Sequence, residues 1–195
     1  MPDFEWVTAA PISYVPPNEA EARLKRFRDN VRAYGQVAGN SEISARLNSH
    51  QTDALFIRRV MKARLGSDFL LFEYRYCGEP IALMQLDFHG GYVDIKNLVT
   101  HPGTEKAGGV MVEFALNQPQ HYNAQRPGLL MEGVVGLSSY SLASTAAYLA
   151  LGFTKDSDRG SEMTLVAAKS TKWQRVNGSW CLTAYVGQRY ASATI

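Results

Sequence analysis

The stretch that most constrains this chain runs from Asp94 to Leu116 and reads DIKNLVTHPGTEKAGGVMVEFAL. It opens as an apolar-rich strand, breaks at Pro102, and passes through a polar loop that Gly108 and Gly109 close before an amphipathic helix. The first N–H groups of a helix have no partners within the helix, and the helix dipole places partial positive charge there. A strand that leads through a glycine-containing loop into a helix therefore predicts a binding site for an anion such as a phosphate.

The bulk composition is that of an ordinary globular protein. The chain has 195 residues, with 46% hydrophobic and 11% aromatic residues and a net charge of +2, so nothing favours nucleic acid or a membrane as a partner. Cys77 and Cys181 form neither a metal pattern nor a disulfide framework, and reduced thiols are the simpler interpretation. The sequence has no bilayer-spanning apolar run and no signal-peptide pattern at its start, so we expect a cytoplasmic protein; a secretion signal read by a specialised machine stays an alternative.

The first third of the chain is expected to be mostly helical. Residues 1–17 are expected to be irregular because of four prolines, with a strand or tether on the domain, carried by Phe4, Trp6, Ile12 and Tyr14, as the alternative. Asn18 and Glu21 have the spacing of an N-cap with its capping-box partner. The apolar stripe of the helix that follows is Ala22, Leu24, Phe27, Val31 and Tyr34. Residues 41–65 form a second helical region, whose basic face is interpreted as solvated.

From residue 69 the pattern changes to strands. Residues 69–76, 81–88 and 92–100 each read as a strand, and short turns separate them. Because short turns join antiparallel neighbours, we expect an antiparallel meander.

The remaining elements alternate between helix and strand. The helix that follows Gly109 is expected to end before Pro119. Residues 128–136 form an apolar strand that is reached through a helix and is therefore expected to be parallel to the strand before it. A small-residue helix at 141–151 and a strand at 162–168 follow.

The C-terminal part carries a strong hairpin signal. Asn177-Gly178 stands between two alternating runs within residues 172–182. Trp173 and Trp180 lie on its arms and are interpreted as packing residues. The chain shows no internal repeat, so we expect one domain over 1–195, with an irregular segment at 1–17 and a hairpin and tail at 171–195.

Taken in this order, the elements resemble those of the GCN5-related N-acetyltransferases, over roughly residues 69–168. DIKNLVTHP is similar to the family pattern of an acidic residue, Ile, two variable positions, Leu, and Pro four residues later. YLALGF, which starts at Tyr148, is similar to the family signature Tyr-x-x-Leu-Gly-Phe in complete register. The resemblance implies an α/β fold with a mixed, mostly antiparallel sheet flanked by helices. It also implies direct transfer of an acetyl group from acetyl-CoA, as cosubstrate, to a primary amine of a small molecule or protein.

The chain departs from the family at the cofactor loop. The family usually has Arg or Gln, two spacers, Gly, one spacer, then Gly or Ala. Aligned on Gly108 the basic position holds Glu105, and aligned on Gly109 it holds Lys106. Seven residues before the signature Tyr the family often has Asn, and here Ser141 stands there.

The resemblance assigns cofactor contacts to three segments. The helix start would hold the CoA diphosphate, the main chain of the preceding strand would pair with the pantetheine arm, and two serines would contact the cofactor further along. These residues are Lys106, Ala107, Gly108, Gly109, Val110, Leu98, Val99, Thr100, Ser141 and Ser144. The alternative for the loop is an ordinary strand-to-helix turn that simply needs glycine.

Two residues are expected to carry the catalysis. Tyr148 would protonate the leaving CoA sulfur, because the reference pKa of a phenol, about 10, lies nearer to that of a thiol than a carboxylic acid's does. Asp94 would take the proton from the acceptor amine, directly or through water. A packing Tyr and a strand-end carboxylate are the alternatives, and Glu73 and Glu132 are rival bases.

No metal is expected, because His50, His89, His101 and His121 have no ligand spacing. The acceptor side is expected along residues 18–65 and around 88–92. Near-neutral charge argues against a nucleic-acid acceptor, and a homodimer stays open. Alternatives to the enzyme are a non-catalytic acyl-CoA-binding or protein-interaction module on the same fold, and a secreted effector or toxin that uses the same reaction.

Overall fold

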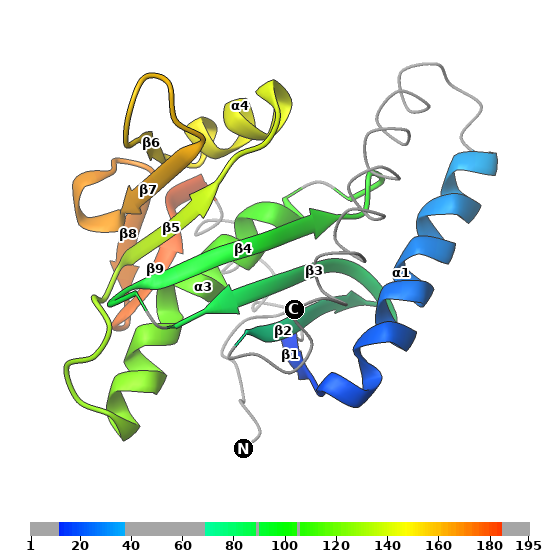
Figure 1. Ribbon diagram of the computed structural model, residues 1–195, viewed down its shortest axis with the longest axis horizontal. Coiled ribbons are helices and arrows are strands. Elements are labelled where there is room, and N and C mark those ends of the chain that lie inside the picture. Colours follow the sequence, from blue (N-terminus) through cyan, green and yellow to red (C-terminus); the bar gives the residue numbers. More distant parts are fainter. Residues whose placement is uncertain (1–11, 38–68, 89, 105, 185–195) are drawn as a thin grey trace, which may run out of the picture. The chain divides into compact units, whose positions relative to one another are not determined.

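The computed structural model describes residues 12–37, 69–88, 90–104 and 106–184. Seven strands form one sheet in the order β1-β2-β3-β4-β5-β7-β6, and β8 and β9 form a separate two-stranded sheet (Figure 1). The strands are β1 (Ile12–Val15), β2 (Leu70–Tyr76), β3 (Glu79–Asp87), β4 (Val93–Thr100), β5 (Val134–Ser138), β6 (Thr154–Lys155), β7 (Glu162–Val166), β8 (Trp173–Val176) and β9 (Ser179–Leu182). The helices are α1 (Pro17–Val37), α3 (Ala107–Gln125) and α4 (Leu142–Ala150), with a 3-10 turn at Ala167–Lys169.

Strand directions confirm the predicted fold class. The pairs β1–β2, β2–β3, β5–β7 and β6–β7 are antiparallel, whereas β4–β5 is parallel. The parallel pair is the one that α3 connects, as a crossover helix requires. The result is a mixed, mostly antiparallel sheet flanked by helices. The predicted helical region 41–65, together with His50, His89 and Glu105, lies outside the described residues.

The chain divides into two compact units. The first contains residues 1–86 and 97–108, and the second contains residues 87–96 and 109–195. The boundaries fall within β4 and within the first turn of α3, so two continuous elements belong to both units. The single domain over 1–195 stays a prediction.

In the first unit, α1 begins at Pro17, and the predicted N-cap at Asn18 is therefore wrong. The fixed φ of proline suits the first helical position, and its missing N–H costs nothing there. The Glu19 N–H donates to the Pro16 carbonyl at 2.9 Å. Ala22 is exposed, and Ala20 takes its place in the buried stripe.

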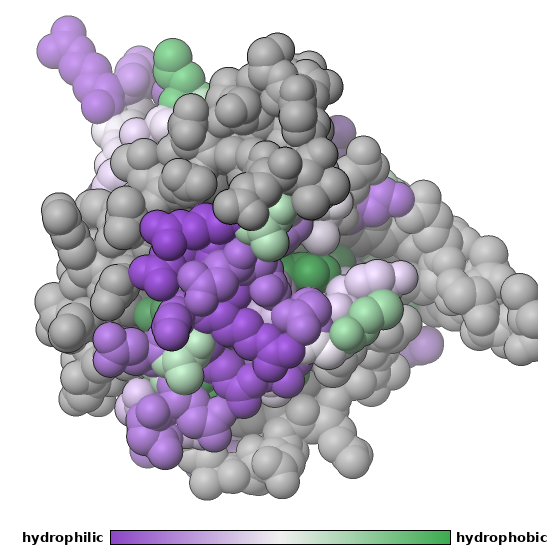
Figure 2. Space-filling view, turned by 90° about the vertical axis from the view of Figure 1, so that its right-hand side faces the viewer, coloured by the Kyte–Doolittle hydropathy of each residue, from purple (hydrophilic) through white to green (hydrophobic). Residues whose placement is uncertain are grey.

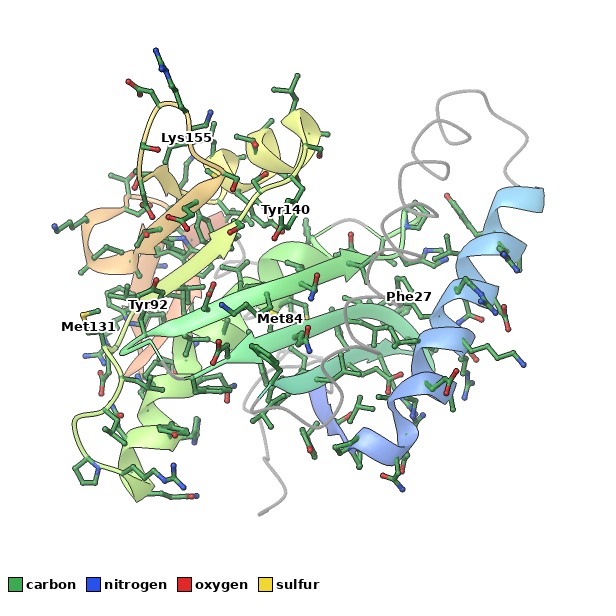
Figure 3. All side chains as sticks on the ribbon, viewed as in Figure 1. Phe27, Met84, Tyr92, Met131, Tyr140 and Lys155 are labelled. Carbon is green, nitrogen blue, oxygen red and sulfur yellow. The ribbon has the colours of Figure 1, made fainter. Side chains whose placement is uncertain are left out.

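The stripe on α1 packs into the core of the first unit. That core comprises Val15, Ala20, Leu24, Phe27, Val31, Leu71, Leu83 and Val99, with Tyr34 packed against it. Phe27 points from α1 toward the strands (Figure 3). The other side of α1 is charged and lies in the hydrophilic area of Figure 2. This amphipathic pattern is what the sequence periodicity predicts.

In the second unit, α3 runs through Pro119 to Gln125, so the predicted end before Pro119 is wrong. A proline in a helix interior costs about 3 kcal/mol. Every residue from 111 to 119 is buried, however, and burying apolar side chains contributes about 1.5–3 kcal/mol each. Packing on all sides of the helix therefore outweighs the proline.

Strand β5 begins at Val134 rather than at residue 128, and β6 was not predicted. The predicted hairpin is confirmed by β8 and β9. Asn177 and Gly178 have φ values of 50° and 85°, as a two-residue type I′ turn requires. In the part of the chain that the structure describes, no helix is long and apolar enough to cross a bilayer.

Candidate functional site

Strand β4 presents one buried and one half-open face. Val93, Ile95, Asn97 and Val99 are buried, and the residues between them are half-buried. Side chains alternate between the two faces of a strand. The half-open face therefore carries Asp94, Lys96, Leu98 and Thr100, which include the predicted base and two of the predicted cofactor contacts.

The pairing of β4 with β5 covers only the beginning of β4. Its register runs from Val93 opposite Val135 to Ile95 opposite Leu137. Residues 98–100 take no part in that register. Strand β5 therefore supplies no register partner for the main chain at this end of β4.

After β4 the chain makes a tight turn in the first unit. The Thr104 N–H and Oγ1 both donate to the His101 carbonyl, at 3.0 and 2.7 Å. The Gly103 N–H donates to Nδ1 of His101 at 3.1 Å. The Tyr34 ring lies 5.0 Å from the His101 ring, and a Cβ on Gly103 would approach Tyr34 to 2.8 Å. Tyr34 therefore holds this turn from α1.

The start of α3 does not need its glycine at position 108. Lys106 adopts the left-handed conformation, with φ 70°, whereas Gly108 and Gly109 do not. Among the described residues, a Cβ on Gly108 would meet Thr100 Cγ2 alone, at an ordinary 3.7 Å. No N–H group of residues 107–110 donates to a described residue outside the helix. The first turn thus offers unpaired donors beside a position without a side chain.

The signature YLALGF forms the C-terminal cap of α4. The Phe153 N–H donates to the Tyr148 carbonyl at 3.1 Å, and the Gly152 N–H donates to the Leu149 carbonyl at 3.0 Å. Gly152 has φ 92°, and the Tyr148 and Phe153 rings lie 5.5 Å apart. These are the two bonds, the left-handed glycine and the apolar contact of a Schellman motif. Packing therefore accounts for the Tyr148 ring, and a chemical role rests on its hydroxyl group alone.

The two predicted cofactor serines form the N-terminal cap of α4. Ser141 Oγ accepts from the Ser144 N–H, and Ser144 Oγ accepts from the Ser141 N–H, both at 3.1 Å. Buried Ser139 joins them through Ser144 Oγ at 2.7 Å and Thr145 Oγ1 at 2.8 Å. Ser141 remains exposed and Ser144 half-buried, so contact with a ligand would have to coexist with the cap.

Asp94 lies in a small charged cluster of the second unit. Its Oδ2 accepts a hydrogen bond from Lys96 Nζ, which also lies 3.4 Å from Asp87 Oδ2. On β5, the register partner of Asp94 is Gly136. A Cβ on Gly136 would lie 2.5 Å from the ring of Tyr92, so this ring covers the glycine on the face that carries Asp94. Tyr92 lies just before the start of β4 (Figure 3).

The rival bases are engaged elsewhere. Glu73 is buried in the first unit, where its Oε2 accepts from Arg75 Nε at 2.5 Å. Desolvation by burial raises the pKa of Glu73, and Arg23 opposes this effect. Glu132 is exposed and pairs with Arg175 at 2.7 Å. Neither glutamate lies on the half-open face of β4.

Sequence reasoning did not single out Lys96 or Asp87, and it included Tyr92 only in the segment 88–92 expected on the acceptor side. The signal for Lys96 and Tyr92 is period-two spacing, because both share the Asp94 side of the strand path. The contact with Asp87 depends on the alignment of β3 with β4, which no local pattern specifies. Among the described residues, no three His, Cys, Asp or Glu side chains are grouped to hold a metal ion.

No protein-family model matches the chain, and no curated protein sequence matches it. Solved structures do resemble it. The AtaT–AtaR complex bound to DNA matches with a TM-score of 0.54 and 11% identity, over 81% of this chain and 95% of that chain. A mutant AtaT toxin bound to the C-terminus of the antitoxin AtaR and to acetyl-CoA matches with a TM-score of 0.52 and 12% identity, over 83% and 96%. A GCN5-related N-acetyltransferase from Rhodopseudomonas palustris has a TM-score of 0.44 and 14% identity, over 91% and 93%.

At such identities a structural likeness defines the fold alone. The order of elements, the mostly antiparallel sheet and the two AtaT matches together give the fold of the GCN5-related N-acetyltransferases.

Proposed function

We propose that this protein is an N-acetyltransferase that uses acetyl-CoA as cosubstrate and binds its diphosphate at the start of α3. The observation that carries the proposal is Gly108, where neither the backbone conformation nor the available space calls for glycine. A ligand that approaches the backbone closely supplies the missing reason. The N–H groups of residues 107–110, which donate to no described residue outside the helix, and the helix dipole favour an anion, and exposed Lys106 adds positive charge.

The rest of the cofactor would lie along β4. Residues 98–100 follow the part of β4 that pairs with β5, so their main chain is suited to pair with the amides of a pantetheine arm. The solved AtaT structure with acetyl-CoA supports this choice of ligand, since it shares the fold. The serine pair at the start of α4 stays a proposal for contact with the cofactor.

In the proposed reaction the acceptor amine attacks the thioester carbonyl in a ternary complex. Asp94 takes the proton that the ammonium must lose, through a water molecule because the aspartate side chain is short. The C–S bond breaks, and the Tyr148 hydroxyl protonates the departing sulfur. The products are an acetylated amine and free CoA. The acceptor is a primary amine of a small molecule or of a protein.

A non-catalytic acyl-CoA-binding module is the second candidate. Two observations favour it: Lys96 already occupies one oxygen of Asp94, and packing explains the Tyr148 ring without chemistry. This candidate predicts cofactor binding without turnover.

The test is thermal melting with and without acetyl-CoA, followed by a thiol-release assay with kanamycin, spermidine, L-lysine and a lysine-containing peptide. The enzyme proposal predicts a rise in Tm and CoA release with at least one amine. Tyr148→Phe keeps the ring contact with Phe153, so it should retain the Tm and the shift with acetyl-CoA while kcat falls about 10²-fold or more. A Tm shift without turnover would favour the binding module, and the absence of any shift would contradict both candidates.

A further inference from the structure

The Lys96 ammonium lies between two carboxylates, one from its own strand and one from the end of β3. It donates to Asp94 Oδ2 and stands 3.4 Å from Asp87 Oδ2. The three side chains are only partly open to solvent, with 28% of Lys96, 26% of Asp94 and 17% of Asp87 exposed. The cluster belongs wholly to the second unit.

The electrostatics of this cluster are simple. Partial burial lowers the pKa of Lys96, but the hydrogen bond with Asp94 and its charge, followed by Asp87, outweigh burial and raise it. The segment of β5 that pairs with this part of β4 reads VVGLS and carries no charge. Lys96 is therefore held as an ammonium ion by these two carboxylates.

Because of this contact, the two carboxylate oxygens of Asp94 differ in their hydrogen bonding. Oδ2 accepts from Lys96, and no hydrogen bond within the described residues engages Oδ1. A carboxylate has room for about four hydrogen bonds, so one oxygen can be fixed while the other stays available. An aspartate pinned in this way has a defined orientation on the half-open face of β4.

We propose that Lys96 is a positioning residue for Asp94: it fixes Oδ2 and directs Oδ1 toward the water that relays the acceptor's proton. The inference rests on the proposed function, in which Asp94 is the base. Asp87 holds the ammonium from the other side, so the lysine does not follow Asp94 when the carboxylate takes up a proton. Misplacing a reacting group by about 1 Å costs up to 10²-fold in rate.

An ordinary ion pair is the competing explanation. A partly exposed pair contributes about 0–1 kcal/mol to stability and nothing specific to a reaction. In that case Lys96 and Asp94 would act on turnover independently. A positioning residue, by contrast, has no effect once the group that it positions is gone.

The experiment compares Lys96→Met, Lys96→Arg, Asp94→Asn and the double variant Lys96→Met/Asp94→Asn. Turnover is measured with acetyl-CoA and the amine of the panel that releases most CoA, after melting curves establish that each variant folds. We expect Lys96→Met to lower kcat about ten- to a hundredfold without changing KM for acetyl-CoA. Lys96→Arg should recover kcat to within about threefold, because the guanidinium also pairs with carboxylates. The double variant should be no slower than Asp94→Asn.

Equal kcat in Lys96→Met and wild type would overturn the inference, and so would a further loss of the same size in the Asp94→Asn background. If Lys96→Met does not fold, Lys96→Gln replaces it, with the same expectations.

A second measurement does not depend on turnover. The Lys96 side-chain nitrogen is titrated by NMR in wild type and in Asp94→Asn, and its pKa should be lower in the variant. An unchanged titration would overturn the inference. Absence of turnover with every amine would instead overturn the proposed function, so the two failures are distinguishable.

Discussion

Gly108 and Gly152 lie in the two family-like motifs, and only the structure shows whether the backbone requires glycine at each position. Gly152 has φ 92°, and a Cβ there would lie 2.4 Å from Ser170 Oγ. The fold therefore requires this glycine. Gly108 has no positive φ, since the positive φ of that loop belongs to Lys106, and no described residue would come closer than 3.7 Å to a Cβ there. A sequence shows glycine at both positions without saying which one the fold requires.

Glu73 gives a residue-scale prediction about pH. Its pKa is raised from an ordinary value near 4.5, mainly by burial, and its Oε1 has no hydrogen-bond partner among the described residues. The folded protein therefore binds the proton of the Glu73 carboxyl group more tightly than the unfolded chain does. The stability that this proton contributes is complete below pH 4.5 and is lost as the pH rises through the folded-state pKa. Relative to wild type, Glu73→Gln should gain stability between pH 5 and pH 8.

Urea unfolding at several pH values measures this effect. Glu79→Gln is the matched control, because hydrogen bonds from Arg26 and Asn30 lower the pKa of Glu79. Its contribution to stability therefore changes with pH only below about pH 4.5 and is constant from pH 5 to pH 8. A constant difference between Glu73→Gln and wild type from pH 5 to pH 8 would count against this account of the buried carboxyl.

At the scale of elements, the glycine after α4 and the hairpin turn were predictable, whereas the N-cap of α1 and the tertiary partners were not. Gly152 after the apolar helix and Asn177-Gly178 in the hairpin are local signals, and both elements formed as predicted. Pro119 was misjudged because α3 is buried on all sides, which no local pattern reveals. Ser141 was predicted at the cofactor on the basis of its register, and its side chain caps α4.

Asn117 on α3 gives the element-scale prediction. Its side-chain amide donates to the Trp180 carbonyl at 2.8 Å and accepts from the Trp180 N–H at 2.7 Å. It thus pairs with the edge of β9 as a neighbouring strand would. Asn117→Ala leaves two part-buried backbone groups of Trp180 unpaired and should destabilise the protein by about 1–3 kcal/mol.

The control is Gln120→Ala, which removes a single exposed bond to the Gly178 carbonyl and should cost under about 1 kcal/mol. Both free energies come from urea unfolding at pH 7. Equal losses in the two variants would show that the Asn117 amide does not hold the hairpin.

At the scale of the whole molecule, the fold could be predicted from the order of elements along the sequence. The meander, the crossover through α3 and the parallel β4–β5 pair followed from strand periodicity and turn length. The contacts at the candidate site could not be predicted from the same local patterns. The partner of Asp94, Lys96, also lies 3.4 Å from Asp87 at the end of β3, and a Cβ on Gly108 would lie 3.7 Å from Thr100. Both depend on distances between segments, which a one-dimensional pattern does not contain.

The most direct test of the whole account is calorimetric titration of acetyl-CoA into wild type and Gly108→Ala, with Gly178→Ala in the β8–β9 turn as a control. The added methyl group fits the fold at 3.7 Å from Thr100, so Gly108→Ala should melt at or above the wild-type Tm. It should nevertheless raise the Kd for acetyl-CoA about tenfold or more, whereas Gly178→Ala should leave the Kd unchanged. Equal affinity in Gly108→Ala and wild type, or no binding by wild type, would contradict a diphosphate site at the start of α3.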